Sequence, residues 1–234
     1  MRYPLALLAV FLVVATLLGI APSHRQDWAL ENALAALAVL ALVLSARRMP
    51  LSRISYTLIF AFLILHEVGA HYTYSEVPYD AWVERLTGET LSARLGLERN
   101  HYDRLVHFSY GLLLAYPFRE LFVRVAEARG FWGYFLPLDV VMSTSMLYEL
   151  IEWGAAEVLA DDLGHAYLGS QGDVWDAQQD MALATLGAVI ALAVTAAIHR
   201  ALDHDFQREW AESLRVKDPR PLGEEAISRL KADA

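Results

Sequence analysis

The 234-residue chain contains no cysteine, which excludes disulfides, thiolate metal sites and cysteine nucleophiles. Basic residues are also few: 19 Lys and Arg stand against 28 Asp and Glu, and no basic stripe typical of nucleic-acid binding is present. Hydrophobic residues make up 56% of the chain and lie in long runs, whereas soluble domains are about 45–50% apolar. The composition therefore excludes an ordinary soluble enzyme and a disordered protein.

Six apolar stretches approach the length of about 20 residues that a transmembrane helix needs. They cover residues 4–21, 28–45, 54–72, 105–122, 134–155 and 181–199. The sequence predicts an all-α polytopic bundle of about six transmembrane helices over residues 1–202, followed by a polar cytoplasmic tail over residues 203–234. The first stretch is long and lacks a clear cleavage site, so we expect an uncleaved helix rather than a signal peptide. The segment EEAISRLKA in the tail is compatible with a short surface helix, although a solvated tail is favoured.

The distribution of Lys and Arg predicts the orientation of the bundle. An even number of spans places both termini on one side, and that side holds 14 Lys and Arg against 5 on the other. Because cytoplasmic segments carry the excess of basic residues, we expect both termini to be cytoplasmic. In a bacterium the two longer outer segments, residues 73–104 and 156–180, would then face the periplasm.

Ionisable side chains gather at one end of the predicted bundle, where the third and fifth stretches end and the fourth and sixth begin. Such groups are costly inside membrane helices and usually face the bundle interior. Several are three or four residues apart and therefore share a helix face. Stretch by stretch they are His66, Glu67 and His71; Asp103 and His107; Glu149 and Glu152; and Asp173, Asp176 and Asp180. We expect the four helix ends to share one polar pocket.

The chemistry of these side chains favours a divalent metal. Imidazoles and carboxylates without thiolates suit Zn, Mn or Fe, and Mg where carboxylates dominate. The predicted metal ligands are His66, His71, Asp103, His107, Asp173, Asp176 and Asp180, and the predicted catalytic residues, one of them as general base, are Glu67, Glu149 and Glu152.

A structural alternative stays open for each of these groups. Asp103, Asp173 and Asp176 can cap helix N-termini, where acids are stabilised. Glu149 and Glu152 stand at a helix C-terminus, which disfavours negative charge, so they need a cation, a proton or a basic partner. Arg99, His101 and Arg104 precede the fourth stretch and offer that basic alternative to a metal.

Several motifs carry a resemblance to a known family. They are HEVGAHYTYSEVPY (66–79), NHYDRLVHFSYGLLLAYPFRE (100–120), YELIEW (148–153) and GSQGDVWDAQQDMALATLGA (169–188). In order and spacing these segments resemble the YjdF family of bacterial inner-membrane proteins over about residues 30–200. The resemblance implies a multi-pass protein of the inner (plasma) membrane and supplies no reaction.

A more distant similarity is to VanZ-like membrane proteins, which implies a role in the cell envelope. It rests on the segment 103–108 (DRLVHF), on Glu149 with Glu152, and on the acids at 173, 176 and 180 followed by Gly187. Two departures weaken it. Asp180 stands where that family commonly has Asn, and the HEVGAH segment has no counterpart.

Three functions remain open at this point. The first is a metal-dependent envelope hydrolase that acts on a lipid or lipid-linked substrate. The second is a non-catalytic membrane protein in which the cluster is a structural polar network. The third is a proton- or cation-coupled transporter, since acids inside membrane helices also mark ion paths. The expected surroundings are the lipid bilayer, with no nucleic acid, and the oligomeric state stays open.

Overall fold

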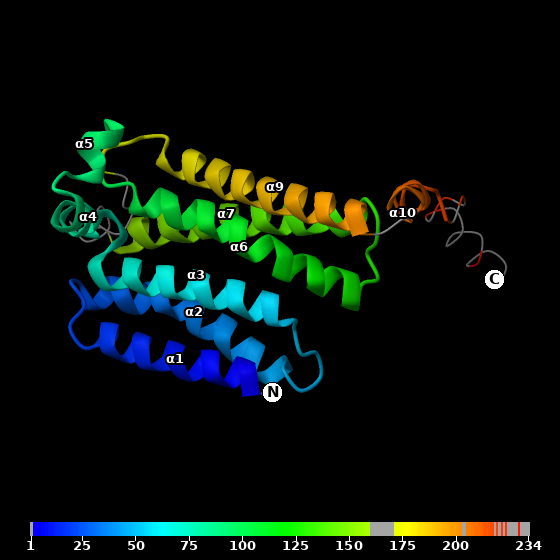
Figure 1. Ribbon diagram of the computed structural model, residues 1–234, viewed down its shortest axis with the longest axis horizontal. Helices are drawn as coiled ribbons and strands as arrows, with labels where there is room; N and C mark the ends of the chain where they lie inside the picture. The colour runs from blue at the N-terminus through cyan, green and yellow to red at the C-terminus, as the bar shows by residue number, and fades with distance from the viewer. Residues whose placement is uncertain are drawn as a thin grey trace.

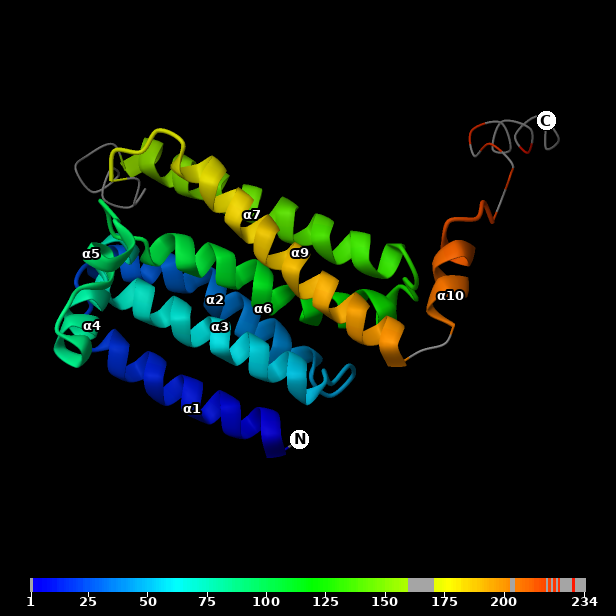
Figure 2. The ribbon, with the colours of Figure 1, turned by 45° about the horizontal axis from the view of Figure 1, so that its top comes forward.

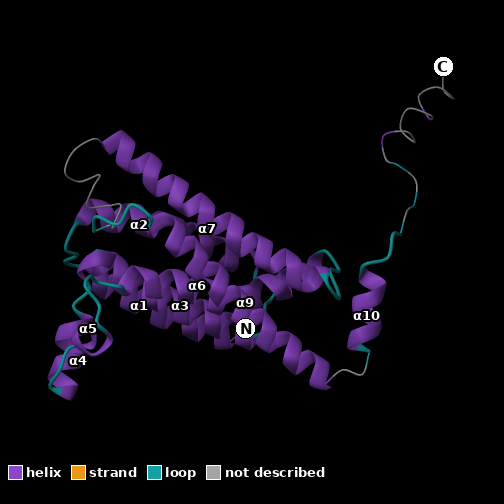
Figure 3. Cartoon of the chain, turned by 90° about the horizontal axis from the view of Figure 1, so that it is seen from above, coloured by secondary structure: helices purple, strands orange, loops and turns teal. Residues whose placement is uncertain are grey.

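The computed structural model describes residues 2–159, 171–202 and 205–217, together with the single positions 219, 221, 223 and 229. Helices make up this part of the chain, and it contains no strand (Figure 3). The six longest are α1 (Arg2–Gly19), α2 (Arg25–Ser45), α3 (Arg53–Tyr72), α6 (Tyr102–Val125), α7 (Trp132–Leu159) and α9 (Asp176–Leu202). Each coincides with one of the six predicted stretches, so the all-α prediction is confirmed.

The six long helices lie side by side in one bundle (Figures 1 and 2). Within the described ranges, α1, α2, α3 and α9 are long and apolar enough to cross a membrane. Helices α6 and α7 have 24 and 28 residues but carry charged side chains and an internal proline each, Pro117 and Pro137. An all-α membrane bundle is thus confirmed, while the number of six spans stays a prediction. Exposed side chains such as Leu17 and Leu37 show the apolar outer surface that lipid would cover.

Helices α6 and α9 pack very closely, because each turns a face with small residues toward the other. A Cβ atom on Gly187 would collide with the carbonyl oxygen of Phe108, and one on Gly111 with that of Ala184. The facing residues recur every four positions, as helix geometry requires. They are Asp103, His107, Gly111 and Ala115 on α6, and Asp176, Asp180, Ala184 and Ala188 on α9. The small residues bring the backbones together and thereby press the acids and the imidazole against each other.

Helix α9 begins five residues before the predicted stretch 181–199, and the reason is physical. Its polar first turns are covered rather than solvated: Asp176 and Asp180 are buried. Packing against α6 keeps this segment helical although it lacks the apolar character that marked the span in the sequence.

The segment between α3 and α6 folds over one end of the bundle (Figure 1). It contains η1 (Tyr74–Glu76), α4 (Tyr79–Thr87) and α5 (Leu91–Leu95). Val77 is buried with Tyr102 and Val106 of α6. We call this the acidic end, defined by the end of α3 and α7 and the start of α6 and α9. The opposite end, where α1 and α3 begin, is the basic end.

The described part of the tail lies at the basic end, where α1 also starts (Figure 1). It forms α10 (Phe206–Ser213), whose Trp210 ring lies 5.9 Å from that of Tyr134. The Ser213 hydroxyl accepts a hydrogen bond of 2.9 Å from the Phe131 N–H. This part of the tail therefore packs on the bundle. The predicted segment EEAISRLKA lies outside the described residues except for Arg229.

Candidate functional site

Three of the predicted ligands meet at the acidic end. Asp103 and His107 of α6 and Asp180 of α9 each offer one donor atom, and these atoms lie within 4.8 Å of one another. His107 and Asp180 are buried, with 8% and 2% of their surface exposed. The site is a product of the close α6–α9 packing, since Gly111 and Ala184 lie one helical turn deeper on the same faces.

Helix α7 contributes a third wall through Glu149. Its Oε1 lies 3.5 Å from His107 Nε2, and the same ring nitrogen is 3.5 Å from Asp103 Oδ1. Both distances are too long for strong hydrogen bonds. Among the described residues, Glu149 Oε1 and Asp180 Oδ1 are buried without a hydrogen-bond partner. Because buried carboxylate oxygens are normally paired, these two point to a ligand or a proton between them.

The acids at the mouth of the site are compensated by arginines. Arg99 Nη1 lies 2.7 Å from Asp176 Oδ1, and Arg104 Nη2 lies 2.7 Å from Asp173 Oδ2. Cross contacts of 3.6 Å from Arg99 to Asp173 and 3.5 Å from Arg104 to Asp176 close the group of four. Asp173 and Asp176 thus form ion pairs instead of joining the three-ligand cluster.

The titration of two groups outside the helices agrees with this charge pattern. Burial, together with the positive charges of Arg104 and Arg99, lowers the pKa of His101. Hydrogen bonds from the Trp175 N–H, the Gln179 amide and Arg104 lower the pKa of Asp173. The acids at the mouth therefore already have partners.

A second polar group reaches the site from α2. The Tyr148 hydroxyl donates a hydrogen bond of 2.6 Å to Glu31 Oε2, and the Tyr148 ring lies edge-on to that of His107 with 5.8 Å between centroids. Glu152 follows Tyr148 by four residues and Glu149 by three on α7, so it lies on the same helix face as both. Neither Glu31 nor Tyr148 is among the site residues predicted from the sequence. One signal was available for Glu31, because it is an acid inside the apolar stretch 28–45.

The predicted residues of α3 have other partners. His66 Nδ1 hydrogen-bonds the Tyr74 hydroxyl at 2.5 Å, and His71 Nδ1 lies 2.6 Å from the Leu18 carbonyl oxygen of α1. Glu67 is fully buried, and its Oε2 has no hydrogen-bond partner in the described part of the chain. The structure thus brings Asp103, His107 and Asp180 together, with Glu149 beside His107. His66, Glu67 and His71 are not part of this group of donor atoms.

The gathered donor set fits a divalent metal chemically. One imidazole and two carboxylates leave coordination positions open for water or substrate, as in catalytic metal sites. Metal–ligand bonds of about 2.1 Å hold two ligand atoms at most about 4.2 Å apart. Separations of up to 4.8 Å therefore require only a small closure of the side chains.

Comparison with known proteins places the chain among membrane proteins. A family model described as "Predicted membrane protein (DUF2238)" matches residues 3–201. The chain is 40% identical over 185 residues to the inner membrane protein YjdF of Escherichia coli strain K12, a match that covers 77% of this chain and 83% of that protein. No solved structure matches the chain. Neither match concerns VanZ-like proteins, so that similarity stays a prediction.

Proposed function

The chain belongs to the DUF2238 family of membrane proteins, as its resemblance to YjdF predicted, and on this premise we propose that it is a metal-dependent hydrolase of the inner membrane. Its substrate would be a lipid or lipid-linked molecule reached at the acidic end. One observation carries the proposal: Asp180 Oδ1 is buried without a hydrogen-bond partner beside the donor atoms of Asp103 and His107.

The balance of charge supports a bound cation. The three acids Asp103, Glu149 and Asp180 surround one imidazole, while the nearby arginines are engaged by Asp173 and Asp176. Removing several carboxylates from water without a counter-charge is strongly unfavourable. A divalent ion held by Asp103, His107 and Asp180 would neutralise two of the three negative charges.

The roles of the residues follow from their positions. Asp103, His107 and Asp180 would hold the metal, which would supply Lewis-acid chemistry for the activation of a water. Glu149 lies 3.5 Å from His107 and is placed to accept a proton as general base. Arg99 and Arg104 at the mouth would orient an anionic group such as a phosphate, which guanidinium groups bind in two-pronged fashion.

The depth of the site supports a substrate that lies at the membrane surface. Asp103 is the second residue of α6 and Asp180 the fifth of α9. At 1.5 Å of rise per residue, both lie within about 6 Å of the helix start. With the predicted orientation this is the outer face of the inner membrane, within reach of lipid head groups and of periplasmic water.

A proton-coupled transporter is the second candidate, because buried acids can share protons in place of a metal. Such a path needs polar groups that continue toward the basic end. Asp139 of α7 is exposed on the bundle surface, and Ser143 hydrogen-bonds the Asp139 carbonyl at 2.7 Å. Thr144 is paired with Tyr110 at 2.6 Å. These contacts favour the hydrolase over the transporter.

Elemental mass spectrometry of the detergent-purified full-length protein tests the metal. We expect close to one equivalent of a divalent metal in the wild type and a loss of most of it in His107→Ala. His71→Gln is the matched control and should keep its metal, since His71 bonds the Leu18 carbonyl away from the cluster. Wild-type protein that holds no metal, even after reloading with Zn, Mn, Fe and Mg, would refute the metal site and leave the structural network or the transporter.

A screen for hydrolysis of phospholipids and lipid-linked sugars by the metal-loaded protein tests the reaction itself. Activity should require the metal and disappear in Glu149→Gln while its metal content stays near wild type. A fully metallated protein without hydrolytic activity on these classes would refute the hydrolase but keep the metal site.

A further inference from the structure

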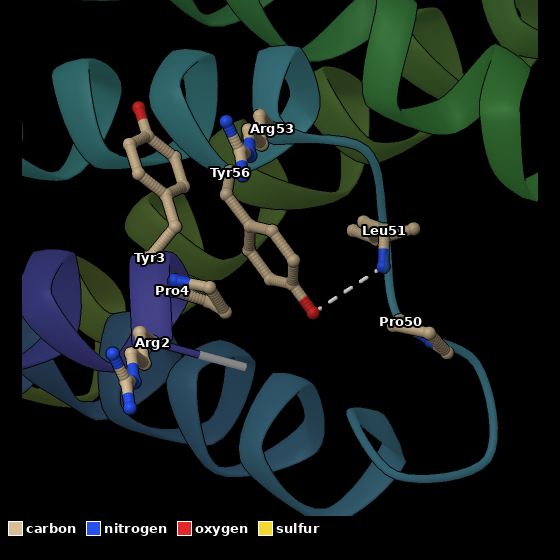
Figure 4. Close-up of a pocket in the computed structure, with 7 residues that line it drawn as sticks. All are labelled: Arg2, Tyr3, Pro4, Pro50, Leu51, Arg53 and Tyr56. Carbon is tan, nitrogen blue, oxygen red and sulfur yellow. Dashed lines mark hydrogen bonds between the residues drawn. The ribbon is translucent and has the colours of Figure 1, made fainter.

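A second site lies at the basic end, far from the acids. A hollow of about 370 Å³ opens between the start of α1 and the segment that leads into α3. Figure 4 shows Arg2 and Tyr3 coming from α1, opposite Arg53 and Tyr56. The 20 residues of α3 separate this hollow from the acidic end, which is about 30 Å at 1.5 Å per residue. It therefore belongs to neither the metal cluster nor its mouth.

The residues that line the hollow carry positive charge and include no described acid. Two guanidinium groups, those of Arg2 and Arg53, contribute this charge. Nearby Arg124 behaves differently: it lies 2.8 Å from Glu120 and donates a hydrogen bond of 2.5 Å to the Pro50 carbonyl. Arg2 and Arg53, by contrast, line the hollow, and neither forms an ion pair with a carboxylate of the described residues.

Aromatic side chains shape the walls. The Arg53 guanidinium lies 5.7 Å from the centre of the Tyr3 ring, and the Tyr3 hydroxyl hydrogen-bonds Thr57 at 2.6 Å. On the other side the Leu51 N–H donates to the Tyr56 hydroxyl at 3.3 Å (Figure 4). Tyrosines at this level are typical of the boundary between lipid and water. These contacts hold Arg53 and the two rings in place around the hollow.

We propose that this hollow binds the phosphate of an anionic phospholipid, with Arg2 and Arg53 as its ligands. Guanidinium groups are well suited to phosphate, and basic pockets between membrane helices are where anionic lipid head groups bind. The surrounding surface favours a lipid over free phosphate. Leu5, one turn below Arg2, is 58% exposed, and Ile54, next to Arg53, is also 58% exposed. Acyl chains can lie along this apolar surface while the phosphate occupies the hollow.

Native mass spectrometry of the detergent-solubilised full-length protein tests the site. The titrants are phosphatidylglycerol, phosphatidylcholine and inorganic phosphate, each added alone. We expect phosphatidylglycerol to bind at least about tenfold more tightly than the other two. The double variant Arg2→Gln/Arg53→Gln should lose this preference. Both side chains are exposed, so the variant should keep its wild-type unfolding temperature.

The matched control is Arg47→Gln/Arg48→Gln, which removes two exposed arginines at the same end that do not line the hollow. This control should bind phosphatidylglycerol like the wild type. An equal loss in both double variants would overturn the proposal, because it would show attraction to net charge rather than to a site. Binding of inorganic phosphate as tight as that of phosphatidylglycerol would also overturn it, in favour of a soluble anion.

Discussion

Replacing Asp180 by Asn separates a metal site from a structural network. The substitution keeps the shape of the side chain and removes one negative charge that faces Asp103. If the cluster is a network that stabilises the fold, losing one member should destabilise the protein. If the cluster is a metal site, its acids repel one another in the metal-free protein. Asp180→Asn should then keep or raise the stability of the metal-free protein.

The expected rise in unfolding temperature follows from how much a bound metal stabilises the folded protein. A ligand present at 100 times its dissociation constant stabilises the folded state by about 2.7 kcal/mol. For a chain of this size each kcal/mol shifts the unfolding temperature by about 2–4 °C, so metal should raise it by about 5–10 °C in the wild type. In Asp180→Asn one of three protein ligands is weakened, and we expect most of this gain to disappear.

Thermal unfolding of the protein in detergent, followed through its six tryptophans, measures both quantities. The protein is first treated with chelator and then compared with and without added Mn or Zn. The reasoning would be refuted by an equal metal-induced shift in wild type and variant. A metal-free variant that unfolds several degrees below the metal-free wild type would equally refute it, since that is the behaviour of a structural network.

Two further predictions concern the scaffold around the site. Gly187→Ala should destabilise the protein by about 1–3 kcal/mol, because the added Cβ meets the Phe108 carbonyl; the thermal assay measures this, and Gly154→Ala, where nothing lies within 4 Å, is the control that should stay near wild type. The Ser92 N–H donates to Asp80 Oδ1 at 2.9 Å, and hydrogen bonds from Ser92 lower the pKa of Asp80 from its usual 3.8. This link between α4 and α5 should therefore be present above pH 3.8 and be lost as the pH falls through the lowered pKa, seen as faster amide exchange of Ser92; a pH response unchanged in Asp80→Asn would contradict the assignment.

The helices themselves could be predicted from the sequence because the apolar runs are long and their ends are marked by charge. The sequence also predicts one pocket shared by four helix ends, since ionisable groups in membrane helices turn toward the bundle interior. The structure brings groups of α6, α7 and α9 together, whereas His66 and His71 of α3 have other partners. Asp103 and His107, four residues apart, do share a face and do join the site. The helical period also limits which side chains of one helix can reach the same site. His66 and His71 are five residues apart, so they point about 140° from each other around the helix axis and turn to different neighbours.

The division of the acids between the buried cluster and the ion pairs at the mouth could not be predicted, because it depends on contacts between distant segments. Asp173 precedes the first residue of α9, and Asp180 is its fifth residue. Of these two aspartates, Asp173 forms an ion pair with an arginine, whereas Asp180 Oδ1 has no hydrogen-bond partner among the described residues. Their difference arises from depth: Arg104 reaches the helix start, whereas Asp180 lies a turn further in. The position of Glu31 inside an apolar stretch could have drawn attention to it, but its pairing with Tyr148 of α7, 117 positions away, could not be predicted.

This layering by depth bears on the choice between the proposed functions. At the mouth, Asp173 and Asp176 are matched by Arg99 and Arg104, so the outer layer is close to neutral. Next to this layer, Asp103, Glu149 and Asp180 surround the single imidazole of His107, and Glu149 Oε1 and Asp180 Oδ1 have no hydrogen-bond partner among the described residues. A network selected only for stability would have placed the arginines where the unpaired acids are, because breaking a buried pair costs about 3–5 kcal/mol. Buried acids without a partner, beside acids that are already matched, favour the proposed uptake of a cation over a purely structural network.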